Sequence, residues 1–73
     1  MNLKQGGMIV QEYDMKFTSL SRYAKAMISN DFEKGKKFER GLRPDVRSGV
    51  AMLRIQTYNH VLEVAIIIEE ELK

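Results

Sequence analysis

Few residues in this chain are of the types that do chemistry. Three adjacent glutamates, Glu69, Glu70 and Glu71, could be read as a catalytic acid pair, but they end a helical segment and no pocket-forming loops accompany them. The single histidine, His60, cannot build a zinc site by itself, and the chain has no cysteine. No nucleophile is paired with a base. We therefore expect no enzyme activity, no metal and no cofactor, with His60 at the surface or in an interface.

The second chemical feature is a basic segment in the middle of the chain, where Lys36, Lys37 and Arg40 could form a polyanion patch. The net charge is only +2, which is too mild to imply nucleic-acid binding from composition. Aromatic side chains for base stacking are not interleaved with these lysines. We expect a solvated helix face here, and a basic helical nucleic-acid-binding module remains the alternative.

The elements that must position these groups are helices. After Gly7, apolar residues recur at intervals of three and four, a spacing that only a helix places on one stripe. Asn30, Pro44 and Thr57 are typical of helix starts, and Gly41 is typical of a helix end. We predict one all-α domain over residues 1–73. It consists of an N-terminal turn or arm at 1–9 and four helices at about 10–26, 31–40, 44–53 and 57–72.

The inward stripes of these helices predict the hydrophobic core. Its members are Val10, Tyr13, Phe17, Leu20, Phe38, Leu42, Val50, Leu53, Val61 and Ala65.

A chain of 73 residues buries only about 60% of the surface that its unfolded form exposes, so its stability is marginal. With disulfide and metal excluded, a partner chain is the remaining means of stabilisation. Val64 and Ile67 form an outward apolar line on the last helix, together with His60 and Glu71. Phe32 and Gly35 on the second helix compete with Val64 and Ile67 as the dimer interface.

The longest apolar run, at 64–68, is far shorter than the roughly 20 residues of a membrane span.

Several short motifs resemble the Gag protein of gypsy-like LTR retrotransposons. They are Leu3-Lys4-Gln5-Gly6, Val10-Gln11-Glu12-Tyr13, Lys16-Phe17, Leu20-Ser21-Arg22-Tyr23-Ala24 and Phe38-Glu39-Arg40-Gly41-Leu42-Arg43-Pro44-Asp45-Val46-Arg47. The stretch looks like the C-terminal lobe of the capsid, similar to the retroviral capsid C-terminal domain, with Gln5 to Phe17 on the major homology region.

The resemblance implies a function and a partner. Such lobes dimerise and help to build virus-like particles in the cytoplasm, so the expected partner is a second copy, with no membrane and no nucleic acid bound by this segment. The chain would be a fragment of a longer Gag polyprotein. A domesticated Gag-derived adaptor that binds peptides is a third reading. A simple dimer and a domain-swapped dimer both remain open.

The resemblance also implies a brace in which Gln5, Gly6 and Lys16 tie the turn to the first helix. Retroviral relatives usually have an arginine where this chain has Lys16, and a lysine cannot make a forked guanidinium contact.

Two local features of the predicted helices are unfavourable. Ile9 cannot cap the first helix, and Glu69, Glu70 and Glu71 crowd the negative end of the last one.

Overall fold

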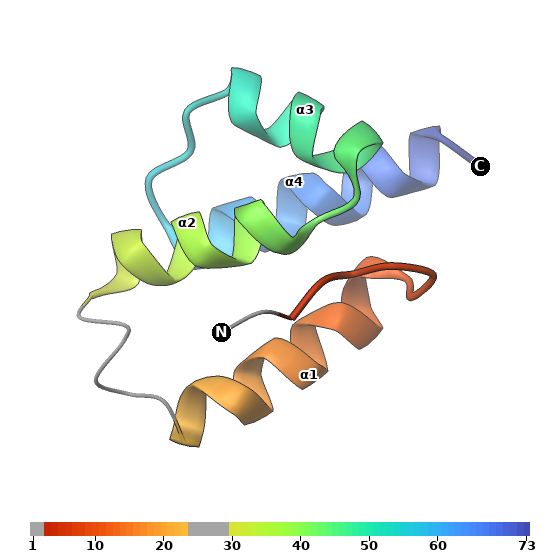
Figure 1. The fold of residues 1–73 in the computed structure, drawn as a ribbon. Helices are drawn as coiled ribbons and strands as arrows, with labels where there is room; N and C mark the ends of the chain where they lie inside the picture. The colour runs from red at the N-terminus through yellow and green to blue at the C-terminus, as the bar shows by residue number, and fades with distance from the viewer. Residues whose placement is uncertain (1–2, 24–29) are drawn as a thin grey trace.

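The structure is a computed structural model that describes residues 3–23 and 30–73. The described chain forms four α-helices, which confirms the all-α prediction (Figure 1). They are α1 (Val10–Tyr23), α2 (Asp31–Gly41), α3 (Pro44–Met52) and α4 (Tyr58–Glu71). Each begins within one residue of its predicted start. The predicted end of the first helix, at residue 26, lies outside the described residues.

The predicted capping residues explain these starts. The Asn30 side chain accepts a hydrogen bond from the Glu33 backbone N–H at 2.8 Å, and Thr57 accepts one from the His60 N–H at 3.4 Å. Both side chains satisfy a donor that the first turn of a helix leaves free. Pro44 occupies the first turn of α3, where no N–H is needed.

Helix α4 lies at the centre of the packing and contacts each of the other three helices (Figure 1). An aromatic cluster fills the space between α1, α2 and α4, with ring centroids 4.7–6.1 Å apart. Its members are Tyr13, Phe17, Phe38 and Tyr58. Rings at these separations add favourable edge-to-face and stacked contacts to the burial of apolar area. The cluster fixes the positions of α1 and α2 on α4.

The predicted core is buried except for Leu20 and Leu53, which are 42% and 61% exposed. Leu20 lies on the predicted stripe, but every buried residue of α1 falls between Val10 and Phe17, so the last turns extend past the core. Leu53 follows the end of α3. The next residue, Arg54, has a φ of 49°, and this left-handed position turns Ile55 inward in place of Leu53.

The N-terminal arm, residues 3–9, joins the end of α2 through a close backbone contact. The Gln5 N–H donates to the Gly41 carbonyl at 2.7 Å. A Cβ at Gly41 would overlap the Tyr13 hydroxyl and come within 2.7 Å of the Leu3 carbonyl oxygen. Only glycine therefore permits this approach of arm, α1 and α2.

Candidate functional site

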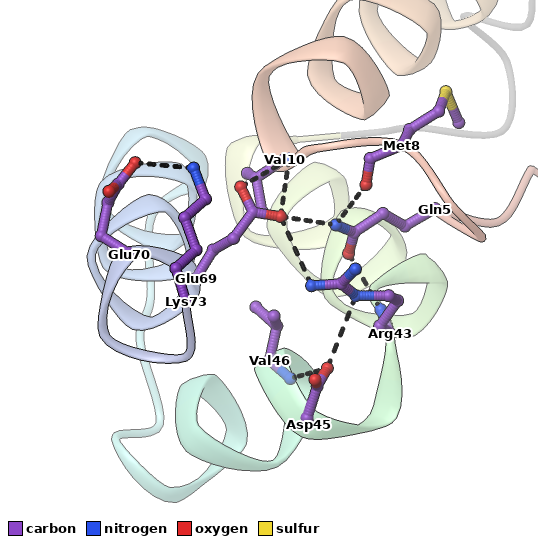
Figure 2. A network of polar contacts seen from close by, with 9 residues as sticks. All are labelled: Gln5, Met8, Val10, Arg43, Asp45, Val46, Glu69, Glu70 and Lys73. Atoms are coloured by element: carbon purple, nitrogen blue, oxygen red, sulfur yellow. Dashed lines mark hydrogen bonds and ion pairs between the residues drawn. The ribbon is translucent and has the colours of Figure 1, made fainter.

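The clearest polar site is a network around the Glu69 carboxylate, drawn in Figure 2. Glu69 lies in the last turn of α4 and is only 4% exposed. Its two oxygens accept the Val10 N–H at 3.1 and 3.2 Å, and Oε2 also accepts the Gln5 side-chain amide at 3.1 Å. We call Gln5, Val10, Arg43 and Glu69 the Glu69 network. It joins the arm, α1, the start of α3 and α4.

The Glu69 network replaces the cap that α1 lacks. Ile9 precedes α1 and has no side-chain acceptor, so the first helical N–H groups need a partner from elsewhere. The Glu69 carboxylate provides that acceptor, together with a negative charge at the positive end of α1. The unfavourable feature at Ile9 and the unfavourable glutamate at the end of α4 therefore compensate each other.

Gln5 ties the arm to α4 and to the start of α3 through its side-chain amide. It is 1% exposed and uses both ends of its amide. Nε2 donates to the Met8 carbonyl at 2.8 Å, and Oε1 accepts the Arg43 backbone N–H at 3.0 Å. Gly6, directly after Gln5, has a φ of 54°, so the turn uses a conformation that glycine adopts without strain.

The basic member of the brace is Arg43, and the prediction of Lys16 is wrong. Arg43 Nη2 lies 3.6 Å from Glu69 Oε2, and Arg43 Nε lies 3.6 Å from Asp45 Oδ1. Lys16 is exposed and lines a shallow groove with Leu3, Ser19 and Leu20. It lies on α1 about two turns from Val10, whereas the network gathers at the beginning of that helix.

A sequence signal for Glu69 existed. Val61, Ala65 and Glu69 follow one another at intervals of four, so the inward stripe of α4 runs onto the glutamate. A glutamate on a buried stripe predicts a buried charge with a partner. No comparable local signal marks Arg43, because the contact depends on how α3 is placed against α4.

A second polar joint connects α1 and α2 to the start of α4. The Tyr58 hydroxyl donates to Asp14, and the Tyr58 N–H donates to Asp31 at 3.0 Å. The Lys34 ammonium lies 4.1 Å from the centre of the Tyr58 ring. Burial raises the pKa of the Asp14 carboxyl above its ordinary value, and the Lys34 charge acts in the opposite direction. The joint fixes helix positions and holds no arrangement typical of catalysis.

The residues predicted for a dimer interface do not share one environment. Ile67 is 60% exposed, whereas Val64 is half-buried and packs against the core. Phe32 is at the surface, with the Lys36 ammonium 5.4 Å from its ring centre. Gly35 is buried, and a Cβ there would lie 3.5 Å from Tyr58 backbone atoms. Gly35 is therefore wrong as a dimer contact, because α4 of the same chain occupies its face.

The predicted polyanion patch is divided. Lys37 and Arg40 line one hollow together with Lys4, which the sequence did not single out. Lys36 lies instead beside Phe32. His60 is exposed, as predicted.

Within residues 3–23 and 30–73, no three acidic, histidine or cysteine side chains come together in a way that could hold a metal ion. None of the helices in the described residues is long and apolar enough to cross a membrane. Comparison of the chain with protein-family models, curated proteins and solved structures found no match.

Proposed function

We propose that this chain is a self-associating structural module, similar to the C-terminal lobe of a Gag capsid, and that it acts by assembly into virus-like particles rather than by catalysis. The observation that supports the proposal best is the environment of Gln5. This residue, which the resemblance assigns to a brace, is buried. Its side chain bonds to Glu69 of α4 and to Arg43 at the start of α3, and its backbone N–H bonds to Gly41 of α2. A brace of this kind holds the surfaces of the lobe in a fixed arrangement.

The outer side of α4 is the surface that we assign to a second copy. His60, Val64, Ile67 and Glu71 follow one another at intervals of four, three and four, and this spacing reads the same in both directions. In an antiparallel pair of α4 helices about a two-fold axis, Val64 would face Ile67 of the second copy and His60 would face Glu71. His60, Ile67 and Glu71 are exposed, so they are free to make these contacts.

This contact is small, and it predicts weak association. One exposed isoleucine and one half-buried valine per copy provide little apolar area. The two His60–Glu71 pairs would therefore fix the register of the helices more than they would raise the affinity of the dimer. In the parent assembly, many such contacts act together, so each of them can remain weak.

The test is the solution mass as a function of concentration. We expect a monomer–dimer equilibrium in sedimentation experiments, and Ile67→Asp should abolish the dimer without unfolding the chain, because it places a charge on the contact. Met15→Asp is the matched control. Met15 is 66% exposed but lies on α1, so this variant should still dimerise. A wild-type chain that stays monomeric up to millimolar concentration would contradict the proposal.

The register has its own test. His60→Glu should weaken the dimer by placing like charges together, and adding Glu71→Lys to that variant should restore it. If the second substitution restores nothing, α4 does not pair in this register.

A further inference from the structure

Beside the arm, the end of α2 forms a hollow of about 150 Å³ that the assembly function does not use. Its lining residues are Leu3, Lys4, Phe17, Lys37, Arg40 and Gly41. The buried Phe17 ring and Leu3 provide apolar contact, and the three charged side chains come from two separate segments. The Gln5–Gly41 backbone bond and the absence of a Cβ at Gly41 bring Lys4 next to α2.

The positive charge of this hollow is unopposed within the described residues. No aspartate or glutamate lines the hollow, and none of the described ion pairs includes Lys4, Lys37 or Arg40. Lys37 is half-buried, and Lys4 and Arg40 are exposed. Like charges in one concave site raise the local potential and favour an anion there.

These cations are not needed to cap α2. Lysine and arginine near a helix C-terminus commonly bind the last free carbonyls. Here the carbonyls of Phe38, Glu39, Arg40 and Gly41 already accept hydrogen bonds from Tyr13, Leu42, Arg47 and Gln5 respectively. The side chains of Lys37 and Arg40 therefore remain available for another acceptor.

We propose that this hollow binds the phosphate group of a small anion. Three cationic side chains give charge-assisted hydrogen bonds to tetrahedral oxygens, and Arg40 provides a fork that matches a phosphate. The size of the hollow suits one phosphate group, and its apolar wall would contact whatever that group is attached to. This inference stands apart from the dimer contact, because the hollow lies between the arm and α2 and not on the outer side of α4.

The experiment is a titration of the ¹⁵N-labelled chain with inorganic phosphate and with pyrophosphate, at constant ionic strength maintained with chloride. We expect saturable amide shifts at Lys4, Lys37 and Gly41. Lys37→Gln should weaken binding by about tenfold, since it removes one charge-assisted hydrogen bond. A parallel arm uses vesicles with and without phosphatidic acid, and it distinguishes a lipid headgroup from a free phosphate.

Lys36→Gln is the matched control, because Lys36 is on the same helix and carries the same charge but lies beside Phe32. It should leave the affinity for phosphate unchanged. Lys4→Gln, on the arm, gives an independent second variant and should weaken binding as Lys37→Gln does. Equal losses for Lys36→Gln and Lys37→Gln would overturn the proposal, because they would show a diffuse basic face. So would the absence of saturation with both anions.

Discussion

At the residue scale, Glu69 combines burial with a position in the last turn of its helix. A carboxylate that is buried and placed at the negative end of its own helix is unfavourable on both counts. The structure compensates with the Val10 N–H, the Gln5 amide and the Arg43 guanidinium. A charge held in this way is costly to leave without its partners, so the network makes one arrangement of arm and helices much more favourable than its alternatives.

We predict that Glu69→Gln lowers the free energy of unfolding by about 2–4 kcal/mol. The glutamine amide has the same shape but would direct an NH₂ group at the donors Val10 N–H or Gln5 Nε2. Urea unfolding at neutral pH measures the change. Glu70→Gln is the control. Its exposed side chain pairs with Lys73 at 3.3 Å, and its effect should stay below about 0.5 kcal/mol. Equal effects of the two substitutions would show that the burial of Glu69 contributes nothing.

The sequence identifies only part of this network. Gln5 is recoverable because it stands in a motif, and the missing cap at Ile9 indicates that α1 needs an acceptor. The identity of that acceptor is not a local property, since Glu69 lies 59 positions from Val10. The resemblance assigns Lys16 from its place before Phe17 in a motif, whereas the basic residue that lies beside Glu69 is Arg43.

At the scale of the elements, two glycines of α2 have opposite consequences. The face of α2 at Gly35 leaves room for a methyl group, since a Cβ would make only ordinary contacts with Tyr58 and Val61 at 3.5 Å. At Gly41 a Cβ would collide with Tyr13 and Leu3. The first glycine therefore only weakens the helix, and the second is required by the packing of the arm.

We predict that Gly35→Ala raises the free energy of unfolding by about 0.5–1 kcal/mol, the difference in helix propensity, and that Gly41→Ala lowers it by about 1–3 kcal/mol through overpacking. Thermal unfolding measures both changes, because about 1 kcal/mol shifts Tm by about 4–8 °C in a domain of this size. A lower Tm for Gly35→Ala would mean that α2 and α4 approach more closely than the structure shows.

The starts of α2, α3 and α4 were predictable because each depends on one or two neighbouring residues, such as Asn30 with Glu33, whereas the start of α1 followed from the apolar period after Gly7. The ends of the stripes were not. Leu53 fits the period of α3, but the left-handed backbone at Arg54 interrupts that period, and Ile55 is buried instead. Leu20 fits the period of α1, but a helix can continue beyond the neighbours that bury it. Periodicity gives the side of a helix, and only packing shows how far along that side the core extends.

At the scale of the whole molecule, α4 has two uses. Its inner side completes the core with Tyr58, Val61 and Ala65, and its outer side carries Ile67. Substitutions on the outer side should therefore separate association from folding, which the Ile67→Asp experiment requires. A small domain also gains apparent stability from a partner by mass action, so the Tm of the wild-type chain should rise with its concentration if the proposed dimer forms.

The bond between Gln5 and Glu69 joins positions 64 residues apart, so it closes nearly the whole chain into one loop. Closing a loop of that length costs conformational entropy, and the hydrogen bond stabilises the chain only once the loop has closed. The Gln5–Glu69 bond is therefore expected to form late in folding. We predict that Glu69→Gln speeds unfolding and leaves the folding rate nearly unchanged. Stopped-flow chevrons measure both rates, and a folding limb slowed as strongly as the unfolding limb is raised would contradict this order. If unfolding alone is faster in the variant, Glu69 determines chiefly how long a folded copy persists.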